Sequence, residues 1–317
     1  MKKVLALCFM LVYGFVYAEI PVPPELKNKN IEMIIPFTPG GDTDGTQRFL
    51  VNIVNKKTGL NIVILNRPGA SAMIGAKQVA SAKPDGLTIL GIDNSVIINS
   101  SLQTPGYVDP NLLTPVAIHS LAPLFLYIKA DSNINTLNEL IKSAKNNPNF
   151  NIGCNVLVAC MYTLEFFNAV GVEPTVVRFK NLSDMPVAID QNLLSLFTAG
   201  ATSGKPFVDG KKIKPIATTW NASLPVYPNA EPISKKVAGF RGFNSQMVYV
   251  PTGTPDHIIK YYNQIFQDAV KSPEFQERAK ELNIIPQTLS SDAAQQFVNS
   301  DYIKYRQLRK YYSNIDK

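Results

Sequence analysis

The sequence has 317 residues, a formal net charge of +7 and 17% charged residues. Basic residues are spread along the chain, and the stretch 302–312, which mixes them with aromatics, has the spacing of an amphipathic helix, so nucleic acid is not an expected partner. The only two histidines, His119 and His257, lie far apart, and the motifs G-x-S-x-G, G-K-S/T and H-E-x-x-H are missing. We therefore expect no enzyme, no metal site and no cofactor.

The first 18 residues have the organisation of a secretory signal peptide. Lys2 and Lys3 form a basic start, residues 4–17 an apolar core, and Ala18 ends a small-residue cleavage site. The apolar run is shorter than the ~20 residues of a membrane-spanning helix. We expect cleavage after Ala18 and a periplasmic mature protein that begins at Glu19, with a net charge of +5 once the two lysines are removed from the +7.

Apolar, β-branched runs alternate with helical patterns in the first part of the mature chain. The predicted elements are a strand at 31–37, a helix at 43–57, a strand at 62–65, a helix at 74–81 and a strand at 88–92. Turn residues separate them, for example Pro39-Gly40-Gly41. This order predicts a β-α-β-α-β unit with a parallel sheet.

A second alternation begins near Leu124, and the C-terminal part adds a strand and several helices. The predicted elements are strands at 124–128, 151–153, 175–178, 193–198, 213–218 and 247–250, and helices at 137–146, 162–169, 255–272, 273–282, 291–299 and 301–312. We therefore predict two α/β lobes, the first made of 19–123 and 240–317 and the second of 124–239. Two crossing segments imply a hinge and place a ligand cleft between the lobes.

Two cysteines remain after cleavage, Cys154 and Cys160. An even number in an oxidising compartment is compatible with a disulfide, but two buried thiols fit the sequence equally well. A zinc site is not expected because no histidine lies near the pair.

The Gly-Gly turn between the first predicted strand and helix is a candidate anion site. Its backbone N–H groups are unobstructed, and the N-terminus of the following helix carries about half a positive charge. The candidate ligand-binding residues here are Thr38, Gly40, Gly41, Asp42 and Thr43. An ordinary turn with Asp42 or Thr43 as the helix N-cap is the alternative. Because a carboxylate would repel an anion, Asp44 is expected to turn toward backbone donors or Arg48.

Five stretches with distinctive motifs follow one another along the chain. They are P-F-T-P-G-G-D-T-D at 36–44, N-R-P-G-A and I-G-A within 66–76, P-D-G-L-T at 84–88, the segment 91–102, and Y-V-P-T-G-T-P at 249–255. Together they resemble the Bug (TctC-like) family, extracytoplasmic binding proteins of tripartite tricarboxylate transporters. The resemblance implies a two-lobed, type II-like periplasmic binding protein fold, with a carboxylate or related small metabolite held between the lobes, and it implies transport rather than catalysis.

The resemblance also implies which other segments reach the cleft. The further ligand-binding candidates are Asn94, Ser95, Asn155, Ala159, Thr198, Ala199 and Thr202. The loop 153–160 departs from the family's Gly- and Ser-rich pattern because it is apolar, so glycines and hydroxyls are lost from that side of the cleft. Asp93, at a predicted strand end, either caps the following helix or pairs with a positive group on the ligand.

These inferences lead to one functional expectation. The chain is predicted to be a monomeric solute-binding protein that captures a small organic acid and delivers it to the membrane subunits of a tripartite tricarboxylate-type transporter. A periplasmic sensor that presents its ligand to a membrane sensor kinase is an alternative, and a periplasmic enzyme is a remote one.

Overall fold

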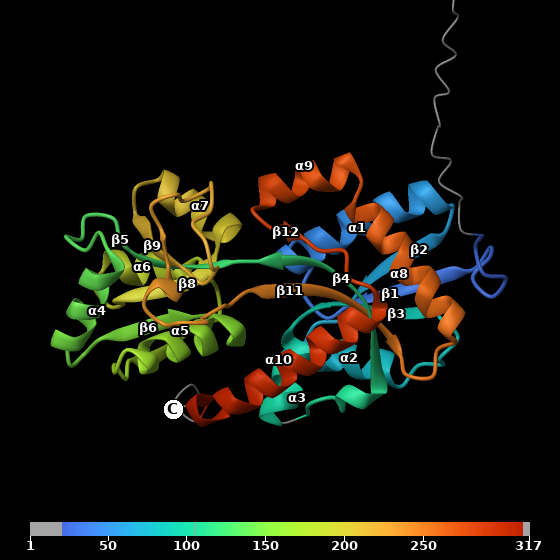
Figure 1. Cartoon of the computed structure of the whole chain (residues 1–317), viewed down its shortest axis with the longest axis horizontal. Coiled ribbons are helices and arrows are strands. Elements are labelled where there is room, and N and C mark those ends of the chain that lie inside the picture. The colour runs from blue at the N-terminus through green and yellow to red at the C-terminus, as the bar shows by residue number, and fades with distance from the viewer. Residues whose placement is uncertain (1–20, 105, 313–317) are drawn as a thin grey trace, which may run out of the picture.

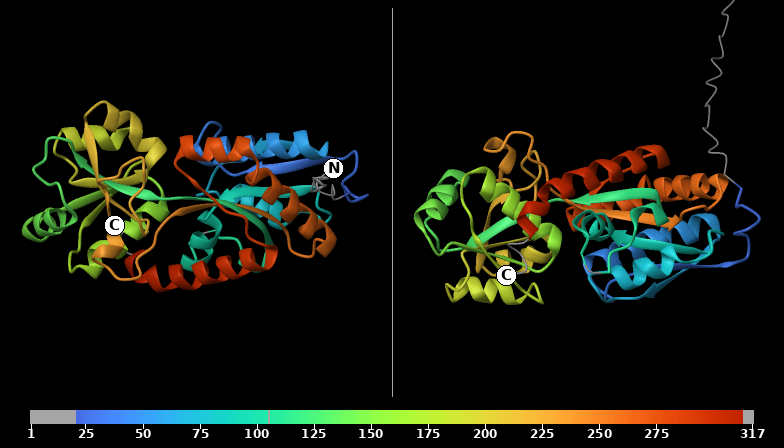
Figure 2. Two further views of the ribbon diagram at one scale, coloured as in Figure 1. Left: turned by 45° about the horizontal axis from the view of Figure 1, so that its top comes forward. Right: turned by 90° about the horizontal axis from the view of Figure 1, so that it is seen from below.

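The computed structural model describes residues 21–104 and 106–312, so the predicted signal peptide lies outside the described residues. The described chain forms two α/β lobes that lie side by side along the long axis of the molecule (Figure 1). Each lobe is built on one six-stranded sheet with helices packed around it (Figure 2). The predicted two-lobed α/β architecture is confirmed.

The first sheet contains the predicted β-α-β-α-β unit. Its strand order is β12-β4-β11-β3-β1-β2, made of β1 (Asn30–Ile35), β2 (Asn61–Asn66), β3 (Thr88–Asp93), β4 (Leu113–Ala122), β11 (Asn244–Pro251) and β12 (Ile285–Pro286). As predicted, β1 pairs in parallel with β2 and β3, whereas β11 runs antiparallel between β3 and β4. The sheet is therefore mixed, and it joins the N-terminal and C-terminal parts of the described chain.

The second sheet is formed by the middle of the chain. Its strand order is β10-β9-β5-β8-β6-β7, made of β5 (Leu124–Lys129), β6 (Asn151–Cys154), β7 (Thr175–Arg178), β8 (Leu196–Gly200), β9 (Ile213–Thr218) and β10 (Glu231–Pro232). β6 pairs in parallel with β7 and β8, and β5 is antiparallel to both β8 and β9. Strands β5 to β10 all belong to this second sheet, and the strands before and after them belong to the first. We therefore propose lobe boundaries near Pro123 and Phe240, in agreement with the division predicted from the sequence.

Six helices belong to the first lobe and four to the second within the described residues. The first set is α1 (Asp42–Thr58), α2 (Met73–Ala80), α3 (Ser95–Leu102), α8 (Asp256–Val270), α9 (Pro273–Leu282) and α10 (Ser291–Tyr312), and the second is α4 (Leu137–Asn146), α5 (Leu157–Ala169), α6 (Asp184–Asp190) and α7 (Ala201–Asp209). Two short 3-10 helices are η1 (Pro110–Leu112) and η2 (Ile233–Lys235). α4 has the predicted bounds because Thr136 and Glu139 form a capping box at its start.

The sequence-based prediction of helices was wrong in three respects. α5 begins at Leu157, well before the predicted start at 162, because the apolar loop is itself the first helical turn. α10 is one helix where two were predicted, and Asp301 continues it with its side chain buried. α3, α6 and α7 were not predicted; α7 contains Gly204 and Pro206, which have low intrinsic helix propensity.

Two segments cross between the lobes and form the hinge region. β4 continues into β5 through Pro123, and residues 236–243 lead back to β11 (Figure 1). Thr219 ties the two crossings together, because its hydroxyl donates to the Gly242 carbonyl (2.7 Å) and accepts from the Leu124 N–H (2.9 Å). α10 also spans the lobes, since it packs against α3 in the first and α5 in the second. Opening of the cleft is therefore expected to bend the chain where the hydrogen-bonded strands β4 and β11 lead into the second lobe.

Gly204 in α7 lies where a larger residue does not fit. A Cβ added there would overlap the ring of Tyr127, which is fully buried. We expect Gly204→Ala to destabilise the protein by about 2 kcal/mol, because overpacking forces the surrounding core to shift. Gly45 in α1 is the matched control: an added Cβ meets nothing within 4 Å, so alanine should stabilise the helix by up to about 1 kcal/mol. Urea unfolding measures both, and equal stabilities would contradict the packing argument.

Candidate ligand-binding site

A cavity of about 550 Å³ lies between the two lobes. Its lining comes from residues 37–38, 40–43, 45–46, 93, 122–124, 155–156, 158, 182, 199–203, 244, 246, 278 and 282–284. The first lobe therefore contributes the Gly-Gly loop, the ends of three strands (β3, β4 and β11) and the end of α9, and the second lobe contributes the starts of α5 and α7. A cavity of this volume is in the range that binds small molecules.

Three helices begin at the wall of this cavity. Their N-cap residues are Gly41 for α1, Val156 for α5 and Gly200 for α7, and none of the three makes a side-chain capping hydrogen bond. All three line the cavity. Because the first N–H groups of a helix lack partners within the helix and carry about half a positive charge, the three helix starts together favour a bound anion. The alternative in which Asp42 or Thr43 caps α1 was wrong.

Asp44 turns toward the partners predicted for it. Its carboxylate accepts hydrogen bonds from the Gly40 N–H (2.9 Å), Arg48 Nε (2.8 Å) and Asn66 Nδ2 (2.8 Å). Burial by itself would raise the pKa of Asp44, but these hydrogen bonds and the Arg48 charge together hold that pKa below its usual value. The Gly40 N–H is thereby occupied, which leaves the donors for a ligand at Gly41 and the first turn of α1.

Two hydrogen bonds join the lobes directly at the cavity. The Ser203 hydroxyl on α7 donates to Asp42 Oδ2 on α1 (2.9 Å), and the Thr202 hydroxyl donates to the Leu282 carbonyl at the end of α9 (2.7 Å). All four residues line the cavity. Since hydrogen bonds of this length form only when both lobes are close, the structure is in a closed arrangement.

Asp93 lies on the cavity lining at the end of β3. One carboxyl oxygen accepts from the Ser95 N–H at the start of α3 (2.9 Å), although the N-cap of α3 is Asn94, and the other accepts from Asn244 Nδ2 (3.4 Å). Asp93 is only 6% exposed, and this burial raises its pKa. A role opposite a positive group on the ligand stays a prediction.

We expect Asp93→Asn to bind a dicarboxylate more tightly than the wild type at alkaline pH. Above its raised pKa the wild-type carboxyl is ionised and repels an anion in the same cavity, whereas below that pKa it is neutral. The ratio of variant to wild-type affinity should rise toward about tenfold as the pH increases. We compare the ratio because protonation of the ligand changes both affinities equally. Calorimetric titrations over a series of pH values measure this ratio. A ratio of one at every pH would show that Asp93 does not affect binding of the anion.

The cavity brings together eight of the twelve predicted ligand-binding residues. They are Thr38, Gly40, Gly41, Asp42, Thr43, Asn155, Ala199 and Thr202. The first five come from the loop after β1 and the first turn of α1, and the other three come from the second lobe, after β6, at the end of β8 and at the start of α7. Their contact with a ligand stays a prediction, but their convergence on one cavity supports it.

The other four predicted residues lie outside the cavity lining, and their contact with a ligand stays a prediction. The Asn94 amide is fully buried and donates to the Tyr305 hydroxyl (2.7 Å), and the Thr198 hydroxyl pairs with Thr163 (2.7 Å). The Ala159 N–H donates to the Val156 carbonyl (3.2 Å), and the Ser95 N–H donates to the Asp93 side chain (2.9 Å). Successive strand residues point to opposite faces of a sheet, so Ala199 lines the cavity while Thr198 does not.

Sequence reasoning missed the lining residues contributed by the C-terminal part of the chain. Arg278 of α9 lines the cavity, pairs with Glu281 (2.7 Å) and lies over the Phe49 ring, 5.9 Å from its centroid. Gln246 lines the cavity from β11, and its Nε2 donates to the Thr43 hydroxyl (3.2 Å). No local pattern marks these residues, because their place depends on contacts between distant segments.

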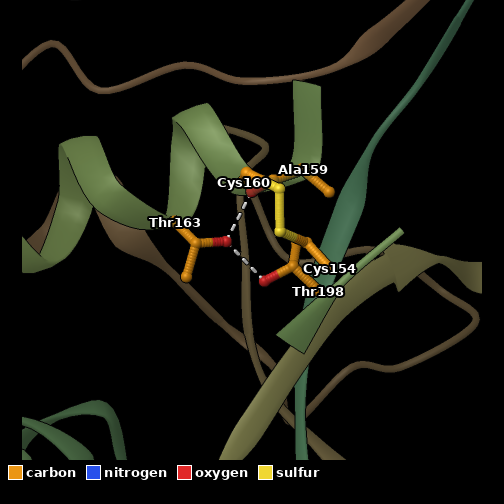
Figure 3. The surroundings of a disulfide bond; sticks show 5 residues. All are labelled: Cys154, Ala159, Cys160, Thr163 and Thr198. Atoms are coloured by element: carbon orange, nitrogen blue, oxygen red, sulfur yellow. Dashed lines mark hydrogen bonds between the residues drawn. A yellow bond between two sulfur atoms is a disulfide. The ribbon is translucent and has the colours of Figure 1, made fainter. Parts of the chain in front are cut away.

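Cys154 and Cys160 form a disulfide, which decides between the two possibilities left open by the sequence (Figure 3). Their Cα atoms are 5.4 Å apart, and both side chains are fully buried. The disulfide closes the loop that carries Asn155 and Val156, both of which line the cavity.

The comparisons with known proteins agree with this architecture. A family model described as "Tripartite tricarboxylate transporter family receptor" (TctC) matches residues 47–312. A relative from Pseudomonas sp. (strain P51), the "UPF0065 protein in tcbD-tcbE intergenic region", is 25% identical over 268 residues, covering 81% of this chain and 78% of the relative. BugT of Bordetella pertussis is 31% identical over 121 residues, or 37% of each chain.

Solved structures share the fold over nearly the whole chain. The periplasmic binding protein BugD has a TM-score of 0.75 at 24% identity, covering 90% of this chain and 97% of that one. An R. palustris protein solved with adipate has a TM-score of 0.78 at 25% identity with the same coverage.

In the described part of this chain, none of the helices is both long and apolar enough to cross a bilayer. The resemblance seen in the sequence motifs is thus confirmed, and the chain belongs to the tripartite tricarboxylate transporter receptor (TctC) family of periplasmic solute-binding proteins.

Proposed function

We propose that the protein captures a small organic acid, with a carboxylate held in the cavity between its lobes, and delivers it to the membrane subunits of a tripartite tricarboxylate-type transporter. The observation that carries this proposal is the convergence of three uncapped helix N-termini on one cavity. Backbone N–H groups and helix dipoles can hold a carboxylate without a dedicated arginine. The related R. palustris structure with adipate supports a carboxylate as the ligand class.

Closure of the lobes is the mechanism that this geometry supports. In the open form the ligand would meet the N-terminus of α1 first, and closure would add those of α5 and α7 from the other lobe. The Ser203–Asp42 and Thr202–Leu282 hydrogen bonds then join the two walls and limit access of water. A transporter can distinguish the loaded protein by this closed shape, so binding without chemical change is sufficient for the proposed role.

A thermal-shift screen of residues 19–317 tests the proposal. The protein is first unfolded and refolded with its disulfide intact to remove any bound metabolite, and is then screened against adipate, malate, a monocarboxylate and a diamine. A ligand that binds only the folded state raises the melting temperature with its concentration, so we expect a saturable rise with a carboxylate and none with the diamine. A rise with the diamine alone would overturn the proposed ligand class.

Delivery to a transporter needs its own measurement. Cells that lack this protein should lose uptake of the labelled carboxylate identified in the screen, and the full-length gene should restore it. If uptake is unchanged while the purified protein binds the same compound, the sensor alternative is favoured instead.

A further inference from the structure

The loop closed by the disulfide is one of the parts of the second lobe that line the cavity. β6 ends at Cys154, the next two residues line the cavity, and α5 begins at Leu157. Cys160 lies in the first turn of α5, with its sulfur bonded back to the strand end. The disulfide therefore joins the last residue of an interior strand to the first turn of a helix that begins at the cavity wall.

The start of α5 lacks the usual means of fixing a helix N-terminus. Its N-cap is Val156, which is apolar and cannot accept a hydrogen bond with its side chain. In most helices a Ser, Thr, Asp or Asn at this position bonds the free N–H groups and holds the entering chain. Here such a side chain would occupy the same N–H groups that a carboxylate ligand needs. A covalent link behind the turn fixes its position and leaves those donors free.

A second contact ties the same turn to the other uncapped helix of this lobe (Figure 3). The Thr163 hydroxyl donates to the Ala159 carbonyl (2.6 Å) and pairs with the Thr198 hydroxyl of β8 (2.7 Å). Both threonines are fully buried. β8 ends at Gly200, the N-cap of α7, so the starts of α5 and α7 are held in one buried framework.

We propose that the Cys154–Cys160 disulfide is a positioning element of the binding site, which holds the α5 N-terminus in its ligand-binding geometry in place of a side-chain cap. The inference rests on the proposed function, because the ligand is taken to be a carboxylate. Without the link, the loop would have to be ordered when the ligand binds, and that ordering lowers affinity. The folded core of the lobe does not depend on it to the same degree, because large buried side chains of α5 itself, such as Phe166 and Phe167, hold the rest of the helix in the core.

The test compares the wild type with the double variant Cys154→Ala/Cys160→Ala. The probe is adipate, or the carboxylate that gave the largest thermal shift, and its dissociation constant is measured by calorimetry. We expect the dissociation constant to rise by about tenfold or more. Amide hydrogen exchange at 155–160 should be faster in the unliganded variant and should slow again when the ligand is saturating. An unchanged dissociation constant, whatever the melting temperature, would overturn the proposal.

Two further variants separate positioning from general loss of stability. Val172→Ala removes a buried side chain just beyond the other end of α5 and leaves the loop intact. It should lower the melting temperature with no change in the dissociation constant; equal weakening of binding by this variant would assign the effect to destabilisation. Thr163→Val keeps the disulfide and removes the second tie, and we expect a smaller, severalfold loss of affinity.

The outcomes also distinguish this inference from the proposed function. If the double cysteine variant does not fold, the wild type with its disulfide reduced replaces it in the binding and exchange measurements, with the same expected and contradicting results. If the wild type binds no carboxylate, the proposed function fails first. Exchange at 155–160 in the unliganded proteins then shows directly whether the disulfide orders the loop, and equal exchange in wild type and double variant would overturn that role too.

Discussion

Replacing Val156 with aspartate is expected to stabilise the unliganded protein and to weaken binding of an organic anion strongly. Val156 has the extended backbone of an N-cap residue (φ −117°, ψ 143°), and its side chain makes no capping bond. An aspartate there would accept hydrogen bonds from the first turn of α5 and complement the charge of the helix, which adds about 1 kcal/mol of stability. The same carboxylate would stand at the cavity wall where the ligand anion is expected.

The affinity for a carboxylate should fall by on the order of 100-fold, because the new side chain takes the N–H donors and repels the ligand. Val156→Asn is the matched control, since it caps the helix without adding a charge. We expect it to keep most of the gain in stability and to lose less affinity than the aspartate variant. Calorimetry and urea unfolding measure the two quantities. Wild-type affinity in Val156→Asp would exclude the α5 N-terminus from the site.

The second large effect concerns Asp301 on α10, close to the contact between the lobes. Asp301 is 7% exposed, and its Oδ2 has no hydrogen-bond partner among the described residues. Burial raises the pKa of Asp301 to about 6, against the opposing effect of the Lys304 and Arg241 charges. Glu165 on α5 lies 3.6 Å from the same Lys304, and burial raises its pKa as well. The ionised form of Asp301 is therefore unfavourable in the folded protein.

We expect Asp301→Asn to be more stable than the wild type by about 2 kcal/mol at pH 8, with a difference that shrinks toward pH 4. The unfolded chain loses the Asp301 proton near pH 3.9, whereas the folded protein keeps it to about pH 6. The folded state therefore binds more protons in this window, and the Asp301 contribution to stability falls as the pH rises through it. Well above pH 6, where both states have lost this proton, the loss is complete and constant.

Urea unfolding of both proteins at several pH values between 4 and 8 measures this difference. Asp131→Asn, at an exposed position of the second lobe, is the control for removing a surface carboxylate. A difference between wild type and Asp301→Asn that does not depend on pH would show that Asp301 keeps an ordinary pKa in the folded protein.

The sequence predicted the bounds of a helix correctly where residues next to its ends, such as a capping serine or a proline in the first turn, fix those ends. α9 has the predicted bounds, since Pro273 occupies its first turn and the Ser272 hydroxyl accepts from the Phe275 N–H. The start of α5 was misplaced because its N-cap is a valine, and sequence reasoning recognises helix starts by polar caps. The missing cap, which hid this helix start from the sequence analysis, is also the feature that keeps its N–H groups available at the cavity.

The sequence by itself determined the alternation of strands and helices in each lobe and the family, and it predicts an anion site at the Gly-Gly loop, because each of these inferences depends on residues that are close together in the chain. Only the tertiary structure decided that the starts of α5 and α7 face that loop, that Arg278 joins the lining, and that Cys154 and Cys160 are bonded. It also decided that Ala199 points into the cavity and Thr198 away from it. These outcomes depend on how two sheets are placed by their packing and on which face each strand residue points to, and neither is encoded in a local pattern.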